Sequence, residues 1–188
     1  MKNEDELVEA VLGGDHGSFE LLLRPYRKGL LNMAYRMTGN LEEAREVCQE
    51  ALIRIFRYLD KFKKEKSFKN WIYKIAVNTS YDFLRRKKKQ ADIVEHQKRL
   101  EMSTVADPEK QLLNKEIKVK IESCLQSLSP KEKAVFLLRD EEGFSIEETS
   151  KILGCSSLSV RTHLSRARQK IRAQFEKLYP MDKREVKI

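Results

Sequence analysis

Apolar side chains recur at intervals of three and four residues along the N-terminal half, which is the spacing that one face of an α-helix requires. Residues 41–59 carry one such stripe: Ala44, Val47, Ala51, Leu52, Ile55 and Phe56. Residues 68–88 carry a second: Phe68, Ile72, Ile75, Ala76, Thr79 and Phe83. The pattern predicts two amphipathic helices. Gly39-Asn40 ends one helix and caps the next, and Ser67 can cap the helix that follows it.

Capping motifs predict the helices of the C-terminal half. Asp107-Pro108 is a cap followed by proline at the first helical position, and Ser129 with Glu132 and Ser145 with Glu148 form capping boxes. Gly154 ends one helix, and Ser156 or Ser157 opens the last. The expected helices span about 108–127, 130–141, 146–153 and 157–178.

A short capped helix, a glycine turn and a longer helix are typical of a helix-turn-helix. One side of the last predicted helix is apolar: Val160, Leu164, Ala167, Ile171 and Leu178. Another side gathers Leu158, Arg161, Thr162, Ser165, Arg166 and Gln169. Residues 161–172 hold five cations and no acid. A helix that enters the major groove needs donors for bases and cations for phosphates, so the pattern favours DNA binding over a plain solvated face.

Composition supports an all-α, nucleic-acid-binding protein. The 188 residues include only 7 glycines and 4 prolines, which argues against all-β folds. The 38 Lys and Arg exceed the 29 Asp and Glu, giving a net charge of +9, which favours a polyanionic partner. We expect a cytosolic chain without membrane insertion, because it lacks long apolar runs and begins with an acidic segment. Its three cysteines are far apart, so we expect no disulfide.

Charge divides the chain into three parts. Residues 1–89 carry 19 basic and 13 acidic residues, and residues 113–188 carry 16 and 11. Residues 90–112 carry only 3 basic against 5 acidic residues, and have few apolar positions. The expected organisation is an N-terminal helical domain (1–89), a linker (90–112) that is partly helical, and a C-terminal helix-turn-helix domain (113–188).

The predicted helix 68–88 presents a polar stripe suited to single-stranded DNA. The stripe contains Asn70, Lys74, Asn78, Tyr81 and Arg85, with Trp71 at its border with the apolar side. Basic clusters at 61–66 and 85–89 frame it. Amides can hydrogen-bond base edges, rings can stack on bases and cations can hold phosphates. Trp71 alone is more typical of core packing, and Asn78 alone of solvated surface; the stripe as a whole favours binding.

The exposed side of residues 41–59 mixes two kinds of polar side chain: Glu42, Glu43, Glu46, Gln49 and Glu50 on the one hand, and Arg45, Arg54 and Arg57 on the other. The acidic half of this face would repel DNA. It is either ordinary solvent surface or a docking site for a basic protein partner.

Four stretches together resemble bacterial sigma factors of the extracytoplasmic-function class. They are TGNLEEAREVCQEALIRIFRYLDKF, SFKNWIYKIAVNTSYDFLRRKKK, LSPKEKAVFLLRDEEGFSIEETSKILGCSS and SVRTHLSRARQKIR, in the family's order and spacing. The resemblance covers nearly the whole chain outside the linker. It implies an all-α fold of two small domains joined by a flexible linker, and an alternative sigma factor that directs core RNA polymerase to promoters and helps open the minus-ten element.

The resemblance also assigns three groups of residues. Glu46, Gln49, Glu50 and Ile53 would bind core RNA polymerase. Trp71, Lys74, Asn78, Tyr81 and Arg85 would bind the minus-ten element, and Arg161, Thr162, Ser165 and Arg166 would bind the minus-thirty-five element. The chain departs from the usual pattern at three positions: Arg45 replaces a common acid, Cys48 an aliphatic residue and Leu158 a frequent glycine. The first two bear on details of polymerase contact, and Leu158 bears on which promoter sequence is recognised.

Two other functional classes fit part of the pattern less well. A stand-alone regulator would bind duplex DNA tightly by itself, usually as a dimer on two half-sites. A nucleic-acid-modifying enzyme is disfavoured, since the sequence carries no metal-ligand spacing, nucleophile constellation or phosphate-binding loop. We therefore expect no cofactor, no metal and no small-molecule substrate. The family resemblance implies one further partner, an anti-sigma factor, which could hold the cytoplasmic chain at the membrane.

Overall fold

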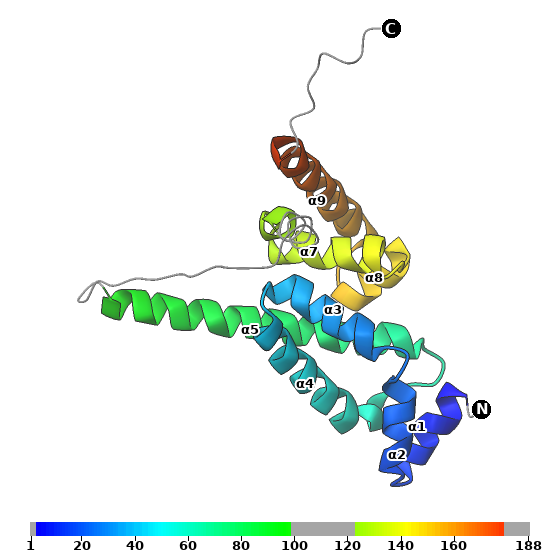
Figure 1. Cartoon of the computed structure of the whole chain (residues 1–188). Helices are drawn as coiled ribbons and strands as arrows, with labels where there is room; N and C mark the ends of the chain where they lie inside the picture. The colour runs from blue at the N-terminus through cyan, green and yellow to red at the C-terminus, as the bar shows by residue number, and fades with distance from the viewer. Residues whose placement is uncertain (1–2, 99–122, 179–188) are drawn as a thin grey trace, which may run out of the picture.

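A computed structural model describes residues 3–98 and 123–178, and every regular element within those ranges is helical (Figure 1). The N-terminal helices are α1 (Glu4–Leu12), α2 (His16–Leu23), α3 (Arg27–Thr38), α4 (Leu41–Arg57), the short 3-10 helix η1 (Leu59–Lys61) and α5 (Phe68–Lys98). The C-terminal ones are α7 (Pro130–Phe136), the π turn η2 (Leu137–Glu141), α8 (Ile146–Leu153) and α9 (Ser157–Leu178). In the described residues no helix combines the length and the apolar character needed to span a membrane.

The local start and stop signals act as the sequence predicts. Asn40 caps α4 through the backbone N–H groups of Glu42 and Glu43, and Gly39 ends α3 in the left-handed region at φ 79°. Both predicted capping boxes form, at α7 and α8. The side chain of Ser156, rather than that of Ser157, accepts the N–H of Ser159 and caps α9.

One helix boundary differs from the expectation, and one predicted helix lies mostly outside the described residues. Helix α5 continues to Lys98, so the first residues of the 90–112 linker extend the helix. The predicted helix 108–127 falls mostly outside the described residues; within them, residues 123–126 are helical.

Phe56 was expected in the apolar core of α4 but is 43% exposed. Its ring lies at the edge of that core, where it packs on His16 and Phe19 of α2.

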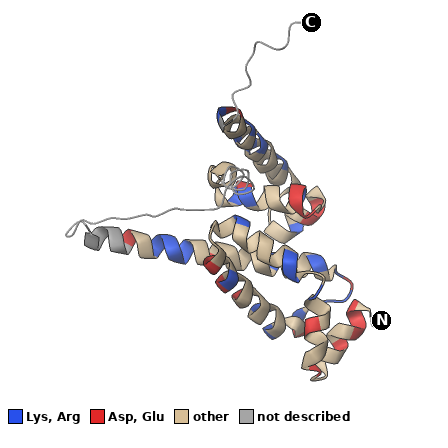
Figure 2. Ribbon diagram, viewed as in Figure 1, with Lys and Arg blue, Asp and Glu red and all other residues tan. Residues whose placement is uncertain are grey.

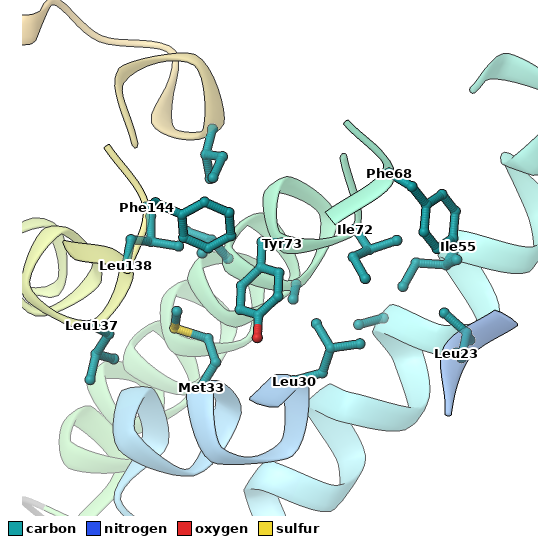
Figure 3. Packing of buried hydrophobic residues seen from close by; sticks show 14 of the residues in the cluster. Leu23, Leu30, Met33, Ile55, Phe68, Ile72, Tyr73, Leu137, Leu138 and Phe144 are labelled. Atoms are coloured by element: carbon teal, nitrogen blue, oxygen red, sulfur yellow. The ribbon is translucent and has the colours of Figure 1, made fainter. Parts of the chain in front are cut away.

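The two halves of the chain share one apolar core. Helices α7 and α8 pack against α3 and α5, on the other side of α5 from α4 (Figure 1). Figure 3 shows the junction, where Leu30 and Met33 of α3 and Tyr73 of α5 meet Leu137 and Leu138 of η2. All five are essentially inaccessible to solvent. The contact therefore removes from water apolar surface that either domain alone would expose.

Polar contacts surround this shared core. The Tyr73 hydroxyl donates to Glu142 at 2.5 Å, and Gly29 leaves the space in α3 that this hydroxyl occupies, since a Cβ there would collide with it. Burial, followed by the hydrogen bond to Glu142, raises the pKa of Tyr73 far above its usual value. Lys69 donates to the Glu142 carbonyl at 3.1 Å and lies over the Phe144 ring. Arg36 pairs with Glu141 across the same junction.

Candidate nucleic-acid interface

The C-terminal helix-turn-helix is built by short-range interactions around a small core. Glu148 accepts the N–H of Ser145 at 2.8 Å while its own N–H donates to the Ser145 hydroxyl at 3.0 Å. Gly154 follows α8 at φ 63°, a conformation that side-chain-bearing residues rarely adopt. Val160 and Leu164 of α9 then pack on the buried side, and the opposite side of α9 is left to solvent.

The five cations of residues 161–172 fall into two groups. Three are engaged within the protein: Arg168 makes a bidentate pair with Asp140 at 2.6 and 2.9 Å, Lys170 pairs with Glu132, and Arg172 with Glu176. Arg161 and Arg166 are exposed, and they have no ion-pair partner among the side chains of residues 3–92 and 123–178. These two are therefore the cations of this segment that remain available to an external anion. Figure 2 shows Lys and Arg positions, in blue, along α9.

The four residues predicted for the minus-thirty-five element are all exposed on the first turns of α9. Arg161 and Ser165 line an open hollow of about 490 Å³, together with Gln169 and Arg172. The Thr162 hydroxyl donates to the carbonyl of Leu158 at 3.0 Å and keeps lone pairs free to accept. His163, which lies on the same helix, instead faces α5, where it lines a hollow of about 390 Å³ with Tyr81.

The α5 stripe is only partly open. Lys74, Asn78 and Arg85 are exposed, and Arg85 pairs with Asp82 of its own helix at 2.8 Å. Trp71 is half-buried against the rings of Phe62 and Phe68, so the core and surface interpretations each hold in part.

Tyr81 lies at the contact between the two domains. Burial, with a smaller effect of the nearby Cys155, raises the pKa of the Tyr81 hydroxyl well above its usual value.

A cleft of about 690 Å³ separates the start of α5 from α8. Its N-terminal wall contains Ser67, Asn70, Trp71 and Lys74; its C-terminal wall contains Glu148, Lys151 and Ile152. Asn70 donates across it to Glu148 at 3.3 Å. The structure thus brings Trp71 and Lys74 together but sets the helix-turn-helix domain directly opposite them, a juxtaposition that the sequence did not indicate.

The predicted polymerase-binding residues lie along one face of α4. Glu46, Gln49 and Ile53 are exposed, and 44% of Ile53 is accessible. Glu50 pairs with Arg54 at 2.8 Å, and Arg54 also donates to Asp82 of α5 at 2.9 Å. Arg54 thereby fixes the acidic face of α4 to α5, a role that no sequence motif signalled.

Known proteins with similar sequences cover nearly the whole chain. The family described as Sigma-70 region 2 matches residues 22–90, and the one described as Sigma-70, region 4 matches residues 118–171. The ECF RNA polymerase sigma factor SigW of Bacillus subtilis is 30% identical over 91% of this chain and 96% of its own length. The RNA polymerase sigma-H factor of Pseudomonas aeruginosa is 29% identical over 90% of this chain and 92% of its own length.

Two solved structures have a similar fold. CnrH, solved in complex with the cytosolic domain of CnrY, superposes with a TM-score of 0.70 at 20% identity, covering 93% of this chain and 99% of CnrH. The sigma factor RpoE from Bartonella quintana, in complex with the anti-sigma factor NepR, superposes with a TM-score of 0.67 at 22% identity, covering 84% of this chain and 96% of RpoE.

Proposed function

Since the chain belongs to the extracytoplasmic-function class of RNA polymerase sigma factors, we propose that its three candidate surfaces divide promoter recognition and polymerase binding between them. The chain directs core RNA polymerase to promoters and is a transcription initiation factor rather than an enzyme. Its partners are core RNA polymerase and promoter DNA. The three surfaces lie on α9, α5 and α4, and each serves one of these contacts.

Helix α9 reads the minus-thirty-five element through Arg161, Thr162, Ser165 and Arg166. One observation carries this assignment: Arg161 and Arg166 are exposed and unpaired within the described part of the chain, while Arg168, Lys170 and Arg172 are held by carboxylates. Arginine hydrogen-bonds guanine in the major groove with two donors, so free guanidinium groups at the start of the helix suit base contacts. Arg168 instead positions the helix on the π turn.

Helix α5 binds the minus-ten element through Trp71, Lys74, Asn78, Tyr81 and Arg85. Lys74 and Asn78 are exposed beside the half-buried Trp71, so phosphate, base edge and aromatic contacts are available on one surface. Unstacking a base costs a few kcal/mol. The energy for opening comes from binding, and Asn78 contributes through its amide once a base has left the duplex.

Replacing Asn78 by alanine is expected to leave formation of the closed promoter complex within about two-fold and to slow strand opening about ten-fold, a barrier increase of roughly 1.4 kcal/mol. The amide acts only on unpaired bases, and its exposure makes folding insensitive to the change. Permanganate footprinting over time measures opening. Asn32→Ala removes an exposed amide from α3 and serves as the control. Equal opening rates in the two variants would remove Asn78 from the proposal.

The face of α4 that carries Glu46, Gln49, Glu50 and Ile53 binds core RNA polymerase. Its charged groups surround the accessible Ile53, an arrangement typical of an interface with an apolar centre and a polar rim. Ile53→Ala is expected to weaken binding to core polymerase about ten-fold, because apolar carbons lost from a newly buried contact cost about 1–2 kcal/mol. Leu41→Ala, at the exposed start of the same helix, should change the affinity for core polymerase less than two-fold. Fluorescence anisotropy of the labelled chain titrated with core enzyme tests both.

The contact between the domains has to open at a promoter. The two elements lie about 25 base pairs apart by their names, or about 85 Å at roughly 3.4 Å per pair. In the structure, Asn70 of α5 and Glu148 of the helix-turn-helix are joined by a hydrogen bond. One chain can occupy both elements only after this contact separates.

An anti-sigma factor is the partner proposed to control this transition. The sigma factor RpoE of Bartonella quintana was solved in complex with the anti-sigma factor NepR, and the fold of this chain is similar to that of RpoE. An anti-sigma factor anchored in the membrane would hold the chain at the cytoplasmic side. Co-purification of the chain from membrane and soluble fractions, with and without that partner, tests this location.

The decisive test of the function uses the purified chain with bacterial core RNA polymerase. Stable association and specific run-off transcripts from promoter fragments are the expected results. Tight binding to duplex DNA by the chain alone, without association with core polymerase, would instead favour a stand-alone regulator.

A further inference from the structure

Leu158 is the most exposed large apolar side chain in the described residues. Its accessible fraction is 71%, whereas the others range from 40% to 54%. It is the second residue of α9, two positions after the Ser156 cap, so its backbone is fixed at the helix start. No side chain of residues 3–92 and 123–178 buries it, and a leucine this exposed contributes nothing to a core.

Its position relative to the DNA-binding residues points to a purpose. At roughly 100° per residue, Leu158 lies about 20° around the helix from Ser165 and about 40° from Thr162. Arg161 lies about 60° away on one side, and Arg166 about 80° away on the other. The leucine is thus in the middle of the proposed reading surface. Its carbonyl also holds the Thr162 hydroxyl at 3.0 Å.

Charge identifies the class of occupant. The side chains around Leu158 are two arginines without a carboxylate partner in the described ranges and two hydroxyls, a set that attracts an anionic, hydrogen-bonding surface. The major groove of DNA offers such a surface with a single kind of apolar group in unmodified sequence, the 5-methyl of thymine. An apolar side chain among donors matches a thymine among hydrogen-bonding base edges.

We propose that Leu158 is a specificity-determining residue that contacts the 5-methyl group of a thymine in the minus-thirty-five element. This inference rests on the proposed function of α9. It adds that the recognised sequence contains a thymine at the position facing the helix start, and that the chain recognises its methyl rather than its hydrogen-bonding groups.

The test replaces single thymines by deoxyuridine, which pairs with adenine in the same way and lacks only the methyl. A promoter is first selected with wild-type holoenzyme from a library randomised over the minus-thirty-five region. At one thymine, deoxyuridine should weaken holoenzyme binding three- to ten-fold. The same replacement should change the binding affinity of holoenzyme carrying Leu158→Ala less than 1.5-fold. Leu158→Met, which keeps an apolar side chain, should retain most of the dependence on the methyl.

The possible outcomes distinguish a failure of this inference from a failure of the proposed function of α9. If the selected element holds no thymine, or if deoxyuridine affects wild type and Leu158→Ala equally, the inference is wrong while α9 still reads DNA. If the holoenzyme selects no minus-thirty-five sequence at all, the proposed function of α9 fails. Leu158 is exposed, so Leu158→Ala should keep the helical content and melting temperature of wild type, which circular dichroism verifies.

A methylated cytosine distinguishes the methyl from the rest of the thymine. Replacing the critical T·A pair by C·G should weaken wild-type binding, and 5-methylcytosine at that position should recover part of the loss. Recovery is expected for wild type and Leu158→Met and not for Leu158→Ala. Recovery in Leu158→Ala would show that another side chain makes the contact and would overturn the proposal.

Discussion

Replacing both Arg161 and Arg166 by alanine is expected to lower holoenzyme affinity for a selected promoter by thirty-fold or more. A bidentate arginine–guanine contact discriminates by about 1–3 kcal/mol, so two such contacts amount to about 2–6 kcal/mol. Both guanidinium groups are exposed and make no ion pair in the described part of the fold, so their removal leaves the protein's own contacts intact. Filter binding to the selected promoter, and to one with a scrambled minus-thirty-five element, measures the loss.

Arg172→Ala is the matched control for this prediction. Arg172 is exposed on the same helix, six residues beyond Arg166, and pairs with Glu176. Because Glu176 already pairs with this guanidinium group, its loss should leave holoenzyme affinity for the selected and the scrambled promoter each within about two-fold of wild type. The double variant should lose the preference for the selected element. If the double variant kept that preference, the assignment of Arg161 and Arg166 to base recognition would be refuted.

Replacing Phe144 by alanine is expected to open the contact between the domains. The Phe144 ring is 3% exposed, packs edge-on against Tyr73 at 5.0 Å between ring centroids, and lies beneath Lys69. Truncating a buried phenylalanine costs about 3–5 kcal/mol. Because this ring packs on the other domain, much of that loss falls on the interface. Small-angle X-ray scattering should show a larger radius of gyration for the free chain.

A second expectation follows from the same change. If the free chain must open before both promoter elements can be bound, the closed population reduces the apparent affinity. Phe144→Ala should therefore bind core polymerase and promoter DNA at least as tightly as wild type, despite its lower stability. Tyr73→Phe removes only the hydroxyl that donates to Glu142 and should produce a smaller shift in the same direction. An unchanged radius of gyration at unchanged helical content would contradict the prediction.

The features predicted correctly from the sequence are those set by neighbouring residues. A capping box involves a residue and the third residue after it, so Ser145 with Glu148 indicates the start of α8 without knowledge of the fold. Gly154 likewise ends α8 through its own backbone conformation. The bounds of α9 follow from these signals and from the period of its apolar side.

The contact between the domains could not be predicted in this way. Tyr73 and Val77 were absent from the apolar stripe expected for α5, yet both are buried, because α5 packs on two sides. The helical period of apolar residues identifies one buried face of a helix. It gives no sign of a second face that a distant segment of the chain covers. The same reasoning explains Tyr81, which lies beside residues 129–131, Cys155 and His163, all far from it in the sequence.

Among the candidate site residues, the sequence grouped cations that the structure separates. Five positive charges in residues 161–172 are equivalent in the sequence, since their carboxylate partners lie on other turns and helices. Asp140 and Glu132 distinguish Arg168 and Lys170 only once the helices are packed. The exposure of Arg161 and Arg166 supports the assignment made from the family resemblance.

The π turn Leu137–Glu141 has a consequence for how charge is distributed as the chain works. Its two neighbouring carboxylates are directed to different domains: Asp140 holds Arg168 of α9, and Glu141 holds Arg36 of α3. When the domains separate, the Asp140–Arg168 pair stays together with α9, whereas the Glu141–Arg36 pair breaks. Arg36 and Lys69 are then released from their partners in the other domain. Under the proposed separation, the N-terminal domain would therefore expose two cations, Arg36 and Lys69, that the closed chain holds against the other domain, and both would become available to phosphates.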